Sequence, residues 1–134
     1  ARDANHETAL FTASGAGEPD VVEVLLAAGA AVDARDRHGV TPLIVASWGH
    51  RHTIRADVVR ALLAAGADVN ARDQWGRTAL SMASGSVTNR TDMVRALLAA
   101  GANVNARDQW GKTALARARA QPIVEVLRAA GAEK

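Results

Sequence analysis

One five-residue sequence recurs along the chain at nearly constant intervals, and this repetition limits the possible folds more than any other feature. Val-Asn-Ala-Arg-Asp begins at Val69 and at Val104, and Val32 begins the close variant Val-Asp-Ala-Arg-Asp. The final Asp residues of these copies and an equivalent Asp3 are spaced 33, 37 and 35 residues apart. A period of this length predicts a stack of similar structural units, each in contact with its neighbours.

Each unit carries the sequence signals of a tight turn followed by two helices. The Asp of each copy is followed by an x-x-Gly segment, which favours a turn because glycine readily adopts the left-handed backbone. Pro42 fits the first position of a helix, where its missing N–H costs nothing. Leucine pairs such as those at Leu62 and Leu97 indicate a second helix, which a following Gly can end. The first helix of each unit is expected to be capped by Thr8, Thr41, Thr78 and Thr113.

Together these signals resemble the ankyrin repeat. The family's Thr-Pro-Leu-His-x-Ala signature appears as Thr-Ala-Leu-Phe-Thr-Ala, Thr-Pro-Leu-Ile-Val-Ala, Thr-Ala-Leu-Ser-Met-Ala and Thr-Ala-Leu-Ala-Arg-Ala, in chain order from the four capping threonines. The family's closing sequence, Leu-Leu-x-x-Gly-Ala-x-Val-Asn-Ala, is complete at 62–71 and 97–106. The resemblance implies one all-α domain over 1–134, an ankyrin-repeat solenoid of four helix-turn-helix units with β-turn fingers. Its repeats are expected at residues 2–34, 35–71, 72–106 and 107–134.

The chain departs from the family pattern in three ways. The signature His is replaced in every unit, so we expect stability to depend on apolar packing; the replacements are Phe11, Ile44, Ser81 and Ala116. Extra residues lie between the two helices at 48–55 and 84–90. The last unit has Arg128 where other units have Leu, as a terminal cap requires. Leu127 in that cap is expected to have fewer neighbours than Leu62, and its truncation to cost less.

The sequence contains no pattern typical of an enzyme. It has no Cys, which excludes disulfides, thiol catalysis and Cys zinc sites, and it lacks the common nucleophile, P-loop and metalloprotease motifs. The Asp residues recur at the repeat period, so we interpret them as turn-forming groups. His50 and His52, with His38 as a distant third, are too few for a zinc site. We therefore expect no catalytic residue, no metal and no cofactor.

Charge is distributed unevenly along the chain and suggests the chemistry of a partner. The net charge of +2 divides into −5 over residues 1–34 and +7 over residues 35–134. The positive finger residues favour an acidic protein segment as the partner. Nucleic acid is a less favoured alternative because the cations are few. No apolar run is long enough to cross a membrane. The finger cations of the last three units are Arg35, Arg37, Arg72, Arg77, Arg107 and Lys112.

Two tryptophans occupy the same position in adjacent turns and are the strongest candidates for contact with a partner. Trp75 and Trp110 each lie between Asp-Gln and Gly. An exposed Trp at a finger tip would be a binding hot spot. Alternatively, each ring lies back on an Arg such as Arg72 or Arg107. We assign Arg37, His38, Trp75, Arg77, Trp110 and Lys112 as partner-binding residues.

The sequence therefore predicts a non-enzymatic protein–protein interaction module. The resemblance to ankyrin repeats implies that the partner binds along the concave face made by the fingers and first helices. The chain is expected to be a monomer. The alternative is a purely structural or accessory repeat array without a groove partner. The frequent Ala and Arg residues are typical of a bacterial GC-rich genome, and the lack of Cys is compatible with the reducing cytoplasm or the bacterial periplasm.

Overall fold

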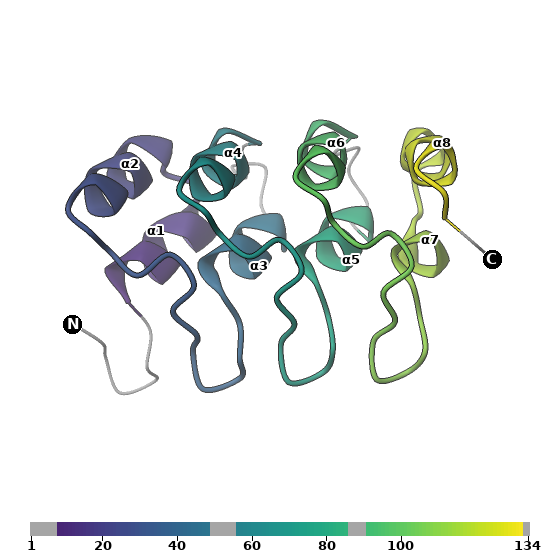
Figure 1. Ribbon diagram of the computed structural model, residues 1–134, viewed down its shortest axis with the longest axis horizontal. Coiled ribbons are helices and arrows are strands. Elements are labelled where there is room, and N and C mark those ends of the chain that lie inside the picture. Colours follow the sequence, from purple (N-terminus) through teal and green to yellow (C-terminus); the bar gives the residue numbers. More distant parts are fainter. Residues whose placement is uncertain (1–7, 49–55, 86–90, 133–134) are drawn as a thin grey trace.

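The helices of the chain form two parallel rows. The structure is a computed structural model and describes residues 8–48, 56–85 and 91–132. Figure 1 shows α1, α3, α5 and α7 in one row and α2, α4, α6 and α8 in the other, with loops extending from the stack as fingers. The expected all-α solenoid is confirmed. The helices of the described part are α1 (Ala9–Ala16), α2 (Pro19–Ala27), α3 (Pro42–Ser47), α4 (Ala56–Ala64), α5 (Ala79–Ser84), α6 (Thr91–Ala99), α7 (Ala114–Arg117) and α8 (Gln121–Ala129).

Threonine caps begin the helices of the first row, as the sequence predicts. In each unit the Thr hydroxyl accepts a hydrogen bond from the backbone N–H three residues later, which satisfies one of the free donors at the helix start. Thr78 goes further, because its own backbone N–H donates to the Ser81 hydroxyl and completes a capping box. The Ser that replaces the signature His in this unit therefore has a structural role.

Glycine ends the helices of the second row. Gly66, which follows α4, has a φ of +90°, a conformation that costs glycine nothing. Its N–H donates to the Leu63 carbonyl and the N–H of Ala67 to the Leu62 carbonyl, both at 3.0 Å, which closes the helix. This geometry confirms the predicted C-terminal cap.

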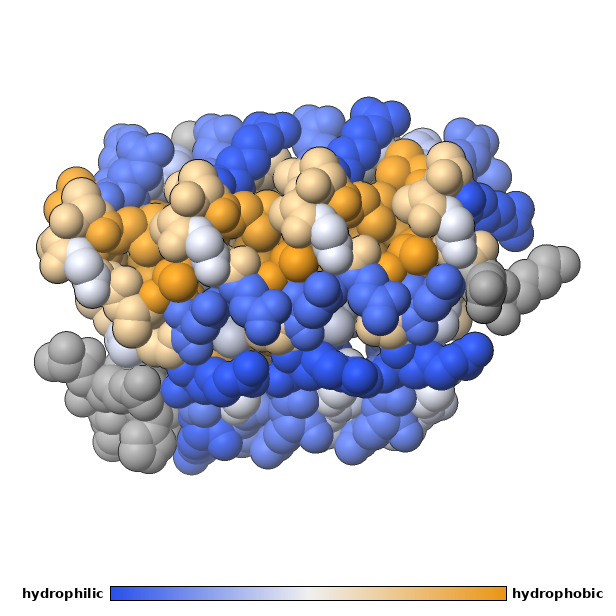
Figure 2. Space-filling view, viewed as in Figure 1, coloured by the Kyte–Doolittle hydropathy of each residue, from blue (hydrophilic) through white to orange (hydrophobic). Residues whose placement is uncertain are grey.

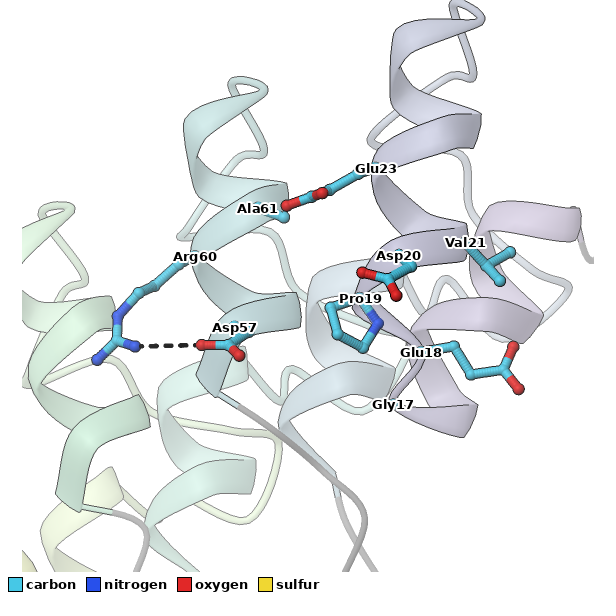
Figure 3. A pocket seen from close by; sticks show the side chains of 9 residues that line it. All are labelled: Gly17, Glu18, Pro19, Asp20, Val21, Glu23, Asp57, Arg60 and Ala61. Atoms are coloured by element: carbon cyan, nitrogen blue, oxygen red, sulfur yellow. Dashed lines mark ion pairs between the residues drawn. The ribbon is translucent and has the colours of Figure 1, made fainter.

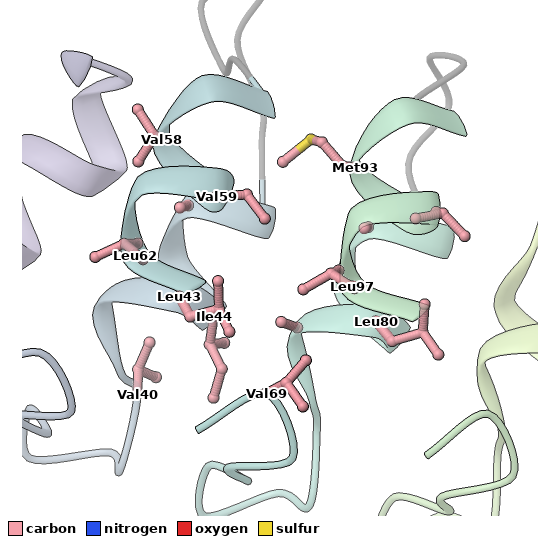
Figure 4. Close-up of a cluster of buried hydrophobic side chains, with 14 of the residues drawn as sticks. Val40, Leu43, Ile44, Val58, Val59, Leu62, Val69, Leu80, Met93 and Leu97 are labelled. Atoms are coloured by element: carbon pink, nitrogen blue, oxygen red, sulfur yellow. The ribbon is translucent and has the colours of Figure 1, made fainter. Parts of the chain in front are cut away.

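The core lies between the two rows and is continuous from unit to unit. Figure 4 shows Leu43, Leu62, Leu80 and Leu97 among the buried side chains of two adjacent helix pairs. All four are at most 1% exposed. Each helix also packs on its counterpart in the next pair, α1 on α3 and α2 on α4, for example. The apolar faces of one pair are therefore buried largely by the next pair, as stacking requires.

Hydrogen bonds join successive fingers into one edge. The described fingers comprise residues 35–40, 72–77 and 107–112. The backbone N–H of Gln74 donates to the His38 carbonyl, and that of Gln109 to the Trp75 carbonyl, both at 2.9 Å. A side chain also links two fingers, because the Arg35 guanidinium donates to the Arg72 carbonyl at 2.7 Å. These hydrogen bonds therefore hold the fingers in fixed positions relative to one another.

The two ends of the stack are packed differently. At the N-terminal end Val21 is 44% exposed, whereas its counterpart Val58 in the next pair is fully buried. At the C-terminal end Arg128 is exposed, as expected of a cap. Leu127 is as fully buried as Leu62, although among the described helices α8 packs on only two and α4 packs on three. Its burial comes from α6 and α7, which pack on α8. The smaller cost expected for truncating Leu127 stays a prediction.

Candidate functional site

The carboxylates of Asp36, Asp73 and Asp108 form the finger turns and place the residues at their tips. In each described finger one oxygen of the turn Asp accepts the backbone N–H groups two and four residues later, at 2.8–2.9 Å. This confirms that the periodic Asp residues are turn-forming groups. The residue two positions after each Asp therefore has an equivalent backbone position in all three fingers. These tip residues are His38, Trp75 and Trp110.

The second carboxylate oxygen of two of these turns holds an arginine. Asp73 accepts from Arg77 Nε at 2.7 Å, and Asp108 accepts from Arg117, a residue of α7, through Nε at 3.0 Å and also through Nη2. Burial alone would raise the pKa of the Asp108 carboxyl. Hydrogen bonds from Arg117 and from the backbone of the finger outweigh burial, so the pKa lies below its ordinary value. Both guanidinium groups are thus held in place on the finger face, the surface formed by the fingers and the first-row helices.

The Trp75 side chain is half-buried and packs against neighbouring side chains of the finger face. Its ring lies 5.4 Å from the His38 ring of the preceding finger and 4.6 Å from the Arg77 guanidinium. The same guanidinium lies 5.1 Å from the ring of Trp48, which follows α3. Arg77 therefore contacts two indole rings by cation–π interaction and one carboxylate by a salt bridge. This contact between Trp48 and the finger face was not expected from the sequence.

Trp110 is the exposed member of the tryptophan pair. The side chain is 57% exposed, and the nearest guanidinium, that of Arg117, lies 6.0 Å from the ring centre. The tryptophan rings lie near Arg77 and Arg117, and not on Arg72 or Arg107 as predicted. Arg72 and Arg107 instead donate to carbonyls of their own fingers, at Gly76 and Gly111, and are held along the finger edge.

Two assigned cations remain turned toward solvent. Arg37 is exposed and its Nε donates to the His38 ring at 3.2 Å. Lys112 is also exposed, and among the described residues no carboxylate pairs with its ammonium group. Figure 2 shows a hydrophilic band along the finger edge. The assigned residues therefore differ in role: Arg77 is engaged within the molecule, while Arg37 and Lys112 present charge outward.

A hollow of about 390 Å³ lies beside Trp110 on the finger face. Sequence reasoning missed two of the residues that form it, Met82 and Arg117. Both stand four residues after a capping Thr, and this shared position in the repeat is the signal that could have identified them. The hollow is lined by Arg77, Met82, Trp110, Lys112 and Arg117.

A larger hollow of about 810 Å³ opens between the starts of α2 and α4, in the second row of helices. Figure 3 shows its carboxylate side chains spread apart, with Arg60 turned toward Asp57, at 3.6 Å. Within the described residues no group of three potential metal ligands occurs. His50 and His52, and most of both interhelix insertions, lie outside the described residues. The acidic hollow therefore has no convergent group that would define a site.

Comparison with known proteins agrees with the repeat pattern. The family model described as ankyrin repeats (3 copies) matches the chain at residues 1–73 and at residues 52–134. The two matches together include every residue of the chain. No curated protein matches it. In the part of the chain that the structure describes, no helix has the length and apolar character needed to cross a membrane.

Proposed function

Because the chain belongs to the ankyrin-repeat family, we propose that it binds a partner protein along its finger face and catalyses no reaction. Ankyrin repeats are generally protein–protein interaction modules. The four repeats at 2–34, 35–71, 72–106 and 107–134 form one domain in this proposal. Function resides in the side chains that the fingers and first helices present, since the fold itself accepts many different partners.

The exposure of Trp110 is the observation that carries the proposal. A tryptophan that is 57% exposed leaves a large apolar surface in water, and its burial by a partner would be favourable. The turn built on Asp108 fixes the backbone on both sides of this residue. Binding would therefore cost little conformational entropy at the tip. Trp110 is the proposed anchor, and Trp75 supports the surface beside it.

Charge favours a partner segment that is acidic. The described fingers and first helices of the last three pairs carry seven Arg or Lys residues and three Asp residues. The three Asp carboxylates accept hydrogen bonds from the backbone of their own turns. Arg37 and Lys112 present their charge to solvent and would steer an acidic segment toward the face. Nucleic acid is less favoured, because the other cations of the fingers are already bonded to carbonyls or carboxylates. The chain is proposed to act as a monomer.

A displayed library of random peptides tests this proposal. Peptides selected on the folded chain are titrated against Trp110→Ala and against a control, Val24→Ala, which truncates an exposed side chain of α2 in the second row. We expect Trp110→Ala to weaken binding by about 30-fold, or about 2 kcal/mol, mainly through faster dissociation, and the control to bind normally. Circular dichroism checks that both variants fold.

The opposite pattern would contradict the proposal. Peptides that lose affinity for Val24→Ala and keep it for Trp110→Ala would place binding on the second row of helices. A library that yields no binder would favour the alternative of a purely structural or accessory repeat array.

A further inference from the structure

The hollow beside Trp110 has a specific chemistry, from which we infer that it receives one large apolar side chain of the partner together with an Asp or Glu side chain close to it in the partner's sequence. The inference rests on the proposed function and adds the identity of the ligand groups. It concerns the surface between the last two fingers and the helices α5 and α7 that follow them.

The apolar part of the hollow fits an apolar side chain. Met82 from α5 and Trp110 from the last finger line it with a thioether and an indole ring. Methionine adapts to different side-chain shapes because it is unbranched and polarizable, and it packs well against aromatic rings. The volume of about 390 Å³ is near the lower end of the range for small-ligand sites, about 300–1,000 Å³. One large side chain and a small neighbouring group can occupy such a space.

The polar part of the hollow contains hydrogen-bond donors. The side chains of Arg77, Lys112 and Arg117 have N–H groups and no acceptor. Asp73 occupies Arg77 Nε, and Asp108 occupies Nε and Nη2 of Arg117, so each guanidinium retains further N–H groups. A ligand must therefore supply acceptors. The salt bridges also hold the guanidinium groups in place before binding, which reduces the entropy lost on binding.

Net charge selects a carboxylate as the acceptor. The two arginines are each balanced by the carboxylate that holds them, so their pairs are nearly neutral. Lys112 has no carboxylate partner among the described residues, and it leaves the hollow with one unbalanced positive charge. One ionised Asp or Glu side chain neutralises that charge, whereas a phosphate dianion would exceed it. The apolar wall lies beside this charge, so the two ligand groups must be close in the partner's sequence.

A charge exchange between chain and peptide tests the inference. Random peptides followed by a linker, so that no free C-terminal carboxylate is present, are selected on the folded chain. We expect the selected sequences to pair Leu, Phe, Met or Trp with a nearby Asp or Glu. Changing that acid to Lys should weaken binding at least tenfold, and Lys112→Glu should restore binding of the Lys peptide. The matched control is Arg95→Glu on α6, which makes the same charge change at an exposed position in the second row.

The outcomes separate this inference from the proposed function. Peptides that depend on Trp110 but show no acidic preference, or whose Lys form is not rescued by Lys112→Glu, would overturn the inference and leave the proposed function standing. Rescue by Arg95→Glu to the same extent would attribute the effect to net charge and would also overturn it. Absence of any peptide that depends on Trp110 would overturn both.

Discussion

Truncating the same leucine in two different units measures how much stacking contributes to stability. Leu25 and Leu97 occupy equivalent positions in the second helix of their units. Leu97 is fully buried between neighbouring helices, while Leu25, at the N-terminal end of the stack, is only partly buried. We expect Leu97→Ala to lower the free energy of unfolding clearly more than Leu25→Ala.

The magnitude follows from the groups removed. Leu→Ala deletes three carbon atoms, which at about 0.8 kcal/mol each gives about 2.4 kcal/mol of lost transfer free energy. Because neighbours enclose Leu97, a cavity adds to this loss, and we expect a total of about 3–4 kcal/mol. Leu25 is already partly in water and should lose about 1–2 kcal/mol.

Urea unfolding followed by circular dichroism provides the measurement. The comparison uses the shift in midpoint at unchanged slope, because a changed slope would indicate loss of cooperative unfolding. Equal losses for the two variants, or a larger loss for Leu25→Ala, would refute the argument that stacking of neighbouring units provides this burial.

Three further comparisons test individual contacts by the same unfolding assay. Gly111→Ala should lower the free energy of unfolding by about 1–2 kcal/mol, because its left-handed backbone is strained for alanine. Gly76→Ala should lower it further, because the new Cβ would also lie 3.2 Å from backbone atoms of the next finger. Equal losses for the two variants would contradict this expectation. Arg72→Ala should cost about 1 kcal/mol more than Arg107→Ala, since Arg72 also bonds to a carbonyl of the next finger; the reverse order would exclude that link. Because the pKa of Asp108 is lower in the folded chain, its carboxylate stabilises the fold at pH values above the unfolded pKa of about 3.9, and this stabilisation is lost as pH falls through the folded pKa. Asp108→Asn should therefore lower the free energy of unfolding at pH 7 and make it depend less on pH in acid. An unchanged pH dependence would show that the Asp108 carboxylate does not contribute this stability.

Local signals explain why the fold could be predicted from the sequence. A capping Thr such as Thr41 and a terminal Gly such as Gly66 act within a few residues, so their roles follow from the order of residue types. The repeat period then indicates which helices pack together. Burial at the ends was harder to predict. Leu127 is covered by α6 and α7, and this depends on how the last pair is packed in three dimensions.

The candidate site could be predicted only in part, because its side chains select partners from other units. Trp75 and Trp110 lie in turns that differ only two residues later, at Arg77 and Lys112, but Trp75 meets the His38 and Arg77 side chains, whereas Trp110 remains exposed. The choice of arginine depends on which donors the turn carbonyls already occupy. Arg72 donates to a carbonyl of its own turn, and this leaves Arg77 to contact the indole rings. Such competition between donors is not visible in the order of residues.

The most direct test of the proposed binding face uses the three tryptophans as reporters. Trp48, Trp75 and Trp110 each have one indole N–H, and NMR resolves these signals from the backbone amides. A peptide selected on the chain is titrated into ¹⁵N-labelled protein. Binding at the finger face predicts that the Trp110 indole signal shifts most and that amides of α5 and α7 shift with it. Unchanged indole signals, with shifts confined to amides of α2, α4 and α6, would contradict the account.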